Sequence, residues 1–302
     1  MIHIPGGRFV MGSEHFYREE APVRQVKVDS FWMDETPVTN AQFDAFVAAT
    51  GHITFAEIAP DPKDYPGMLP ALAHPGSLVF VPSAEPVRLD VVNWWDFRLG
   101  ADWRHPTGLD SGVNGLEDHP VVHIAFSDAK AYAEWAGKSL PTEAEWEFAA
   151  RGGLEGADYA WGDALAPDGA LLANYWVGSF PYARRSEFER TSPVRSFPAN
   201  GYGLYDMIGN VWEWTSDWYA MPKTHRKTRG SCCVPSNPRG ALKIESFDPN
   251  EPCRIPRKVL KGGSHLCAES YCQRYRPAAR YPQPIDTSTS HVGFRCVRRI
   301  GA

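Results

Sequence analysis

The stretch Gly209–Trp214, with the sequence GNVWEW, joins a glycine-containing turn to two large aromatic side chains. A second stretch of this kind, NGYG at 200–203, lies just before it. The composition of all 302 residues agrees, with 11 Trp, 26 Gly and 26 Pro. Gly and Pro interrupt regular structure, whereas each aromatic side chain buries a large area. We therefore expect an α+β fold: a single irregular, loop-rich domain over 1–302, with its loops held by Trp, Tyr and bound ions.

Short apolar stretches and helix-capping patterns indicate where regular structure forms around this turn. The elements expected are strands at 8–11, within 26–33 and at 120–126, and helices from Thr39 to Gly51, from Ser127 to Gly137 and from Thr142 to Gly152. Residues 59–115 form a long Pro- and Gly-rich stretch that carries Trp94, Trp95 and Trp103. Loops of this length are usually functional or disordered, and the aromatic content argues against disorder.

Charge and hydropathy exclude several classes of protein. The net charge is −5 and the pI about 6.1, which argues against a nucleic-acid partner. No apolar stretch approaches the roughly 20 residues of a membrane span, so no membrane partner is expected. The first residues lack the pattern of a signal peptide, which predicts a cytoplasmic location. In that reducing compartment the six cysteines should be mostly thiols.

The spacing of Cys267 and Cys272, with four residues between them, is the first pattern that could carry chemistry. Zinc sites usually place two residues between thiols and add a second pair, but Cys232 and Cys233 are adjacent and Cys253 stands alone. Two thiolates without a clear third ligand suit Cu(I). A disulfide or two buried thiols is the alternative, and the spacing alone slightly favours that alternative.

Histidines offer two further hypotheses. His119 and His123 lie four residues apart, but in a strand their Cα atoms would be roughly 13 Å apart, so packing roles are favoured over a metal pair. His265 or His291 could activate Cys267 for hydrolysis, although nothing in the sequence supplies a third, orienting group.

Oxygen ligands cluster around the opening stretch. Asp206 and Glu213 flank Gly209, Asn210 and Val211, and this combines two carboxylates with the carbonyl groups of a turn. Such a mixture suits Ca²⁺, which takes six to eight oxygen ligands. An ordinary turn with solvated acids explains the same residues equally well.

Motifs along nearly the whole chain resemble the formylglycine-generating, sulfatase-modifying family, whose fold is of the C-type-lectin-like type. They are RFVMG (8–12), PVTN (37–40), LPTEAEWE (140–147), NGYGLYD (200–206), GNVWEW (209–214), KGGS (261–264) and GFRC (293–296). More specific is CAESYC (267–272), followed by RYR (274–276), which resembles the active-site segment of the aerobic, copper-dependent members.

The resemblance implies a mechanism. Cu(I) would be held by Cys267 and Cys272, the substrate cysteine would become its third ligand, and O2 would react in a pocket lined by Ser264 and Trp212. Tyr271 and Arg274 would shape the substrate pocket. The implied substrate is a sulfatase polypeptide with a Cys-x-Pro-x-Arg motif, whose cysteine becomes formylglycine. The alternatives are the same copper chemistry on another thiol substrate, or a non-catalytic binding paralogue, against which both thiols argue.

The resemblance also implies two Ca²⁺ sites. The ligands of one are Asp206, Gly209, Val211 and Glu213, and those of the other are Asn174 with the carbonyls of Tyr175 and Phe188. The usual acidic ligand of the second site falls near Ser186, a weaker donor. The segment from Tyr219 to Lys258 carries Cys232, Cys233 and Cys253, matches no well-known member, and could alter which substrate is accepted.

Overall fold

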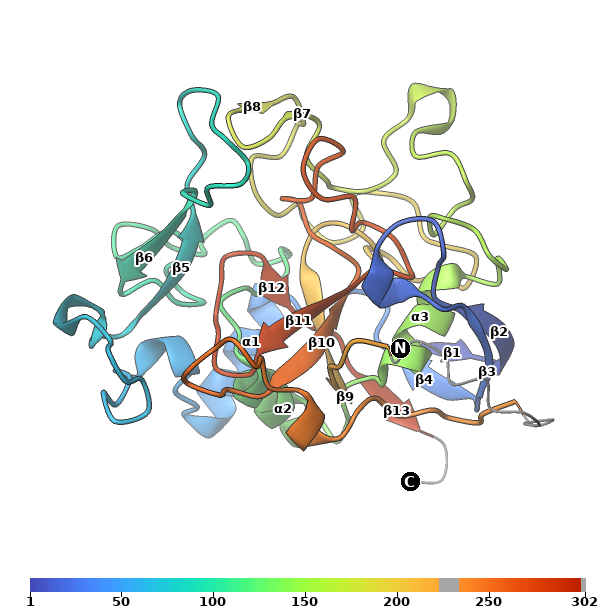
Figure 1. Cartoon of the computed structure of the whole chain (residues 1–302), viewed down its shortest axis with the longest axis horizontal. Coiled ribbons are helices and arrows are strands. Elements are labelled where there is room, and N and C mark those ends of the chain that lie inside the picture. Colours follow the sequence, from blue (N-terminus) through green and yellow to red (C-terminus); the bar gives the residue numbers. More distant parts are fainter. Residues whose placement is uncertain (223–233, 300–302) are drawn as a thin grey trace.

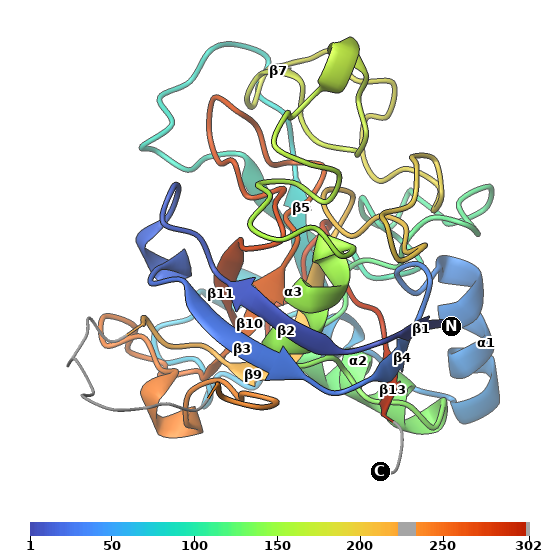
Figure 2. The same ribbon diagram turned by 90° about the vertical axis from the view of Figure 1, so that its right-hand side faces the viewer.

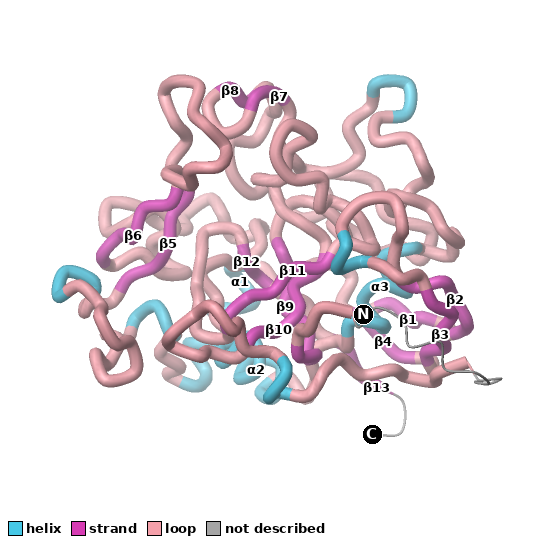
Figure 3. The backbone as a smooth tube through the Cα atoms, viewed as in Figure 1, coloured by secondary structure: helices cyan, strands magenta, loops and turns pink. Residues whose placement is uncertain are grey.

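Short strands joined by long loops make up most of the computed structural model, which describes residues 1–222 and 234–299 (Figures 1 and 3). The central sheet has the strand order β11–β10–β9–β12. Its strands are β9 (Trp212–Trp218), β10 (Arg257–Lys261), β11 (Arg280–Pro284) and β12 (Val292–Gly293). Strand β12 pairs in parallel with β9, and the other pairs are antiparallel. The GNVWEW stretch thus leads from a turn into the middle of this sheet.

A second sheet brings the two ends of the chain together. It has the order β1–β4–β13, with β1 at Ile2–Ile4, β4 at Phe31–Met33 and β13 at Val297–Arg299. The remaining strands of the described residues form two-stranded sheets: β2 (Gly7–Met11) with β3 (Arg24–Val28), β5 (Gly76–Phe80) with β6 (Trp95–Leu99), and β7 (Gly178–Ser179) with β8 (Ala183–Arg184). Figure 2 shows the β2–β3 hairpin lying across α3.

Two of the three helices that the sequence predicts begin and end where expected. In the described part of the chain the helices are α1 (Asn40–Thr50), α2 (Phe126–Trp135) and α3 (Glu143–Arg151), and 3-10 turns lie at Arg18–Glu20, Phe55–Glu57, Pro70–Leu72, Pro167–Gly169 and Lys243–Glu245. Thr39 and Thr142 close capping boxes with the residues three positions on. Gly51 and Gly152 end the helices in the left-handed conformation that glycine adopts readily.

The strand predicted at 120–126 is wrong. His123 has a φ of 60° and a buried side chain, with Nδ1 2.7 Å from Ser77 Oγ and Nε2 2.9 Å from the carbonyl of Pro106. These tertiary contacts hold the backbone outside the extended region. Helix α2 begins two residues earlier than expected, because its N-cap is Ala125, whose N–H donates to the Asp128 carboxylate at 3.0 Å, and not Ser127.

Aromatic side chains fill the core, as the composition predicts. The large cluster lies between the sheets and helices and buries Trp103, Trp146 and Trp214. A smaller cluster joins the β5 and β7 regions to the cysteine segment, and its buried members are Phe80, Trp94, Trp176, Phe180, Leu266 and Ala268. Within the described ranges, no helix is long and apolar enough to cross a membrane. The irregular, loop-rich α+β domain is confirmed.

Candidate active site

Two glycines at the end of β10 set the path of the cysteine segment. Gly262 and Gly263 have φ values of 91° and 71°, and a Cβ on Gly263 would lie 2.5 Å from the carbonyl oxygen of Arg274. Only glycine therefore permits the segment to pack against Arg274. The turn continues through Ser264, whose carbonyl accepts from Cys267 N–H at 3.0 Å and whose Oγ accepts from Leu266 N–H at 3.2 Å.

The two thiols lie side by side. Cys267 is buried, Cys272 is partly exposed, and neither takes part in a disulfide. Burial opposes ionisation of Cys267, but the hydrogen bond from the Cys272 thiol and the contact with the Ser264 backbone lower its pKa. The same hydrogen bond, reinforced by burial, raises the pKa of Cys272 well above its usual value. The two opposite shifts favour Cys267 over Cys272 as the thiolate of the pair.

The thiols open into a cavity of about 450 Å³, called here the thiol cavity. Its lining includes all six residues predicted for the catalytic and substrate sites: Cys267, Cys272, Ser264, Trp212, Tyr271 and Arg274. It also includes Trp94, from the long segment expected to form a functional loop, and residues without a sequence signal, among them Tyr17, Phe180, Tyr281 and Gln283. The structure therefore unites residues from the chain's beginning, its long 59–115 segment and its end.

An aromatic wall, formed by Trp94, Phe180 and Tyr271, borders the thiol cavity. The rings of Tyr271 and Phe180 stack with centroids 4.5 Å apart and an angle of 5°. Trp94 meets both rings edge-on at 5.2 Å. Tyr271 is 39% exposed, so the wall extends from the buried cluster to the surface. This arrangement suits a flat or aliphatic group near the thiols.

Arg274 also lines the thiol cavity, and it holds the N-terminal loop through Glu19 and Tyr17. Its Nη1 lies 2.6 Å from Glu19 and donates to the carbonyl of Arg280 at 2.7 Å. Its guanidinium is 3.9 Å from the ring centre of Tyr17, whose hydroxyl accepts from Gln273 N–H at 3.0 Å. Arg274 is therefore fixed in place with its charge matched by a carboxylate.

The histidines do not form the hydrolytic or metal sites considered from the sequence. Nδ1 of His265 pairs with the carbonyl of Asn210 at 2.9 Å, and burial lowers its pKa far below the usual value. His291 lines the thiol cavity, where burial lowers its pKa to about 3 and Nδ1 pairs with Thr289 Oγ1 at 2.7 Å. In the part of the chain that the structure describes, neither imidazole is hydrogen-bonded to Cys267.

His119 and His123 also have separate partners. Nδ1 of His119 pairs with Thr191 Oγ1 at 3.0 Å, whereas His123 contacts Ser77 and Pro106. Their packing roles agree with the sequence interpretation, although the strand that motivated it is absent.

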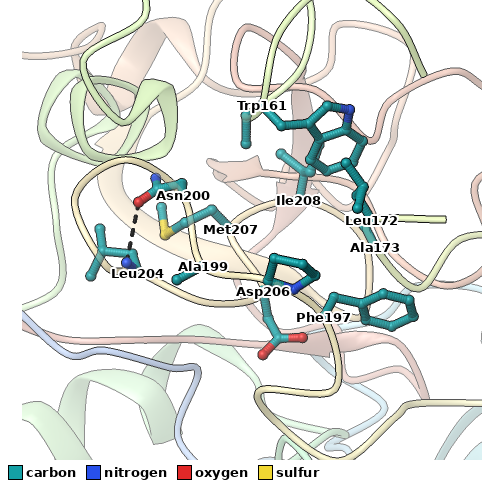
Figure 4. A pocket seen from close by; sticks show the side chains of 12 residues that line it. Trp161, Leu172, Ala173, Phe197, Ala199, Asn200, Leu204, Asp206, Met207 and Ile208 are labelled. Atoms are coloured by element: carbon teal, nitrogen blue, oxygen red, sulfur yellow. Dashed lines mark hydrogen bonds between the residues drawn. The ribbon is translucent and has the colours of Figure 1, made fainter. Parts of the chain in front are cut away.

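Asp206 is the carboxylate of the first expected calcium site that suits a cation. It accepts from Arg195 N–H at 2.9 Å and from the Asn210 side-chain amide at 3.3 Å, both neutral donors. Burial raises the pKa of Asp206, and the nearby Glu213 raises it further. Figure 4 shows its carboxylate pointing away from Trp161 at the edge of a small apolar cavity of about 40 Å³.

Glu213, the other carboxylate of that set, already has its charge matched. Both its oxygens accept from the Arg295 guanidinium, at distances down to 2.8 Å, and Oε2 accepts from Trp146 Nε1–H at 2.7 Å. Gly209 and Val211 lie in the turn between the two acids. The set thus fits Ca²⁺ through Asp206 and backbone carbonyls better than through Glu213.

The second expected calcium set surrounds an arginine. Asn174 Oδ1 accepts from Arg184 Nη2 at 2.8 Å, and Ser186 Oγ donates to the carbonyl of Phe188 at 3.1 Å. Tyr175 contributes a ring that stacks on Tyr275 with centroids 4.6 Å apart. Among the extra cysteines, Cys253 is a partly exposed thiol, while Cys232 and Cys233 lie outside the described residues.

Comparisons with known proteins show which proteins this chain resembles. A family model described as "Sulfatase-modifying factor enzyme 1-like domain" matches residues 1–300. The formylglycine-generating enzyme of Mycobacterium tuberculosis is 52% identical over 300 residues, which cover 98% of this chain and 97% of that protein. The "Inactive C-alpha-formylglycine-generating enzyme 2" of Mus musculus is 34% identical and is covered to 86%, with all of this chain aligned.

Among solved structures, PvdO from Pseudomonas aeruginosa superposes with a TM-score of 0.63 over 99% of this chain and 93% of its own, at 21% identity, which shows a shared fold. The match of the family model to almost every residue, together with the high identity over full length, establishes the family. The chain belongs to the sulfatase-modifying factor enzyme 1-like family, which includes the formylglycine-generating enzymes.

Proposed function

We propose that this chain oxidises the cysteine of a sulfatase Cys-x-Pro-x-Arg motif to formylglycine, using O2 and Cu(I) bound by Cys267 and Cys272. The observation that carries the proposal is the pair of free thiols, Cys267 and Cys272, that line the thiol cavity together. Close relatives named formylglycine-generating enzymes support the reaction. A cytoplasmic location belongs to the proposal, because a reducing compartment keeps the two thiols available.

The donor set fits a soft, low-coordinate ion. Two sulfur ligands favour Cu(I) over hard ions such as Ca²⁺ or Mg²⁺. Within residues 1–222 and 234–299, no group of three or more His, Cys, Asp or Glu side chains could hold a metal. Cys267 and Cys272 would therefore act as the two protein ligands, and the cavity leaves room for a substrate thiolate. When bound, Cu(I) supplies the one-electron chemistry that O2 needs to react with the substrate.

The chemistry requires an external reductant. Conversion of R–CH2–SH to R–CHO and hydrogen sulfide removes two electrons from the carbon, whereas reduction of O2 to water consumes four. A thiol reductant supplies the other two, so that R–CH2–SH, O2, two electrons and two protons give R–CHO, one hydrogen sulfide and one water. A Cβ–H bond and the C–S bond break, and water adds to the thioaldehyde to form the aldehyde.

The residues of the chain position the substrate for this reaction. The buried Trp212 and Ser264 line the cavity near the thiols, which keeps bulk water away from the reacting carbon. The aromatic wall offers a flat surface for the proline two residues beyond the substrate cysteine. Tyr271 lies at the mouth of the cavity and would contact the polypeptide as it enters.

Calcium is a further part of the proposal. We assign one Ca²⁺ to the turn at Asp206, where the carboxylate meets only neutral donors and the turn carbonyls of Gly209 and Val211 are close in sequence. The ion would brace the turn that leads into β9 and thus Trp212.

The test is turnover of a Cys-x-Pro-x-Arg peptide by the Cu(I)-loaded protein in air with a thiol reductant, followed by mass spectrometry. We expect the mass change from –CH2SH to –CHO, and its loss in Cys267→Ser and Cys272→Ser. Cys253→Ser, which removes a thiol outside the thiol cavity, is the matched control and should retain turnover. Turnover unaffected by both active-site changes would refute the proposal. Copper binding without peptide turnover would favour another thiol substrate.

A further inference from the structure

Arg184, at the end of β8, is a partly buried cation whose three side-chain hydrogen bonds all go to neutral oxygen atoms, while the Glu189 carboxylate acts on its charge without a hydrogen bond. Its Nη2 donates to Asn174 Oδ1 at 2.8 Å, its Nη1 donates to the carbonyl of His265 at 2.9 Å, and its Nε donates to Ser186 Oγ. No carboxylate within the described part of the chain is hydrogen-bonded to it. Burial lowers the pKa of Arg184 to about 10, so the guanidinium keeps its charge at neutral pH.

These oxygens belong to the residues expected to bind the second Ca²⁺. Asn174 Oδ1 and Ser186 Oγ both accept from Arg184, and Ser186 O–H donates to the Phe188 carbonyl. Ca²⁺ normally requires six to eight oxygen ligands, including at least one carboxylate in most protein sites. Ser186 offers no carboxylate, and its neighbour Glu187 is exposed. The residues present therefore do not fit the ion.

We propose that the guanidinium of Arg184 replaces a calcium ion at this position and fastens the 174–188 loop to the cysteine segment. The contacts show what is fastened. The carbonyl of His265 lies two residues before Cys267, and the carbonyl of Cys267 accepts from Trp176 N–H at 2.9 Å. The ring of Trp176 lies 5.2 Å from the Arg184 guanidinium carbon. The Arg184 guanidinium thus connects Asn174 and Ser186, which lie before and after Trp176 in the loop, to the carbonyl of His265 in the segment that leads to Cys267.

Arginine suits this role for a geometric reason. Its planar guanidinium directs several N–H donors outward at fixed angles and cannot lose its charge at neutral pH. Three acceptors lie where these donors point: Asn174 and Ser186 in the 174–188 loop, and the carbonyl of His265 beside the cysteine segment. A metal ion would gather the same oxygens, but only with an added carboxylate to balance its higher charge.

The inference is tested by exchanging the arginine for a metal site. We compare the wild type, Arg184→Ala and the double variant Arg184→Ala/Ser186→Asp, measuring bound calcium per chain and the thermal midpoint with calcium and with chelator. Arg184→Ala should melt below the wild type in either condition. The double variant should bind one more calcium than the wild type and regain thermal stability only when calcium is present. Arg185→Ala, which removes the exposed neighbouring arginine, should change neither quantity.

Anomalous diffraction from wild-type crystals grown with calcium keeps the inference falsifiable if the variants fold poorly. The expected map shows no ion between Asn174 and Phe188. A calcium peak there, with Arg184 displaced, would overturn the proposal, as would equal calcium content and equal midpoints in all four proteins. Neither measurement depends on turnover, so failure of the proposed oxidase activity would leave this result interpretable.

Discussion

The ion pair between Glu20 and Arg276 gives the sharpest test of what holds the N-terminal loop against the cysteine segment. Glu20 is 3% exposed and Arg276 is fully buried. The pair is bidentate, with Nη1 2.8 Å from Oε2 and Nη2 bonded to Oε1, and the guanidinium lies 3.6 Å from the ring centre of Phe16. Glu20→Gln keeps the size of the side chain and removes the charge.

The expected loss is large because it leaves a buried guanidinium without a counter-charge. Removing one partner of a buried ion pair costs about 3–5 kcal/mol of unfolding free energy. At about 2 °C per kcal/mol for a chain of this size, the thermal midpoint should fall by about 6–10 °C. Tyr17 and Glu19, which hold Arg274, lie in the same loop as Glu20. Loosening of this loop should therefore also make the Arg274 side chain less ordered.

The assay is equilibrium urea unfolding of the metal-free protein, followed by Trp fluorescence, with thermal melting as a second measure. Asp90→Asn is the control, because the Arg88–Asp90 pair is exposed and its loss should leave the midpoint unchanged. Glu20→Gln/Arg276→Met should regain part of the loss, since an apolar pair of similar volume needs no counter-charge. A Glu20→Gln midpoint equal to that of the control would refute the reasoning.

Four further outcomes follow from the site. In the copper-free protein, the alkylation rate of Cys267 should rise at a lower pH than that of an ordinary thiol, because its pKa is lowered. Cys272 should react only at higher pH, and equal pH profiles for the two cysteines would contradict the opposite shifts. Tyr271→Ala should raise KM for the peptide up to about tenfold through loss of the stacked wall, and Tyr271→Phe should not, as steady-state kinetics would show. Asp206→Ala should lower the calcium content measured by elemental analysis; unchanged calcium would remove Asp206 from the ligand set. Burial lowers the pKa of Lys258 to about 8, so the folded state binds fewer protons than the unfolded state between about pH 8 and 10.5. The unfolding free energy of the wild type should therefore rise through this window relative to that of Lys258→Met. Parallel plots of unfolding free energy against pH for the two proteins would contradict this reasoning.

Local hydrogen bonding explains which elements could be predicted. The capping boxes at Thr39 and Thr142 involve residues three positions apart, and the structure contains both. The run around His123 has the apolar pattern of a strand, yet its conformation is decided by Ser77 and Pro106, far away in sequence. Pattern reasoning captures contacts within one turn of helix and misses a backbone held by distant side chains.

The residues of the candidate site also fall into a group that a local motif identifies and a group that only distant contacts bring to the cavity. Cys267, Cys272 and Arg274 belong to one motif, so the sequence identifies them together. Tyr17 lines the same cavity and accepts a hydrogen bond from Gln273, which lies 256 residues later. No local sequence pattern predicts that Tyr17 belongs to the site. Trp94 is intermediate, because its long aromatic-rich segment predicted a functional loop without saying what the loop would border.

The sequence led us to expect bound ions to hold the loops, but buried arginines do this at two places in the structure. Arg295 donates to the carbonyls of Tyr205 and Asp206 at 2.8 and 3.1 Å while it pairs with Glu213, and Arg184 gathers three oxygens beside the cysteine segment. Each guanidinium makes loop oxygens converge around a positive charge, as a bound cation does. A chelator cannot remove such a charge. The loops around the thiol cavity should therefore keep their arrangement in chelator, with calcium adding stability at the Asp206 turn alone.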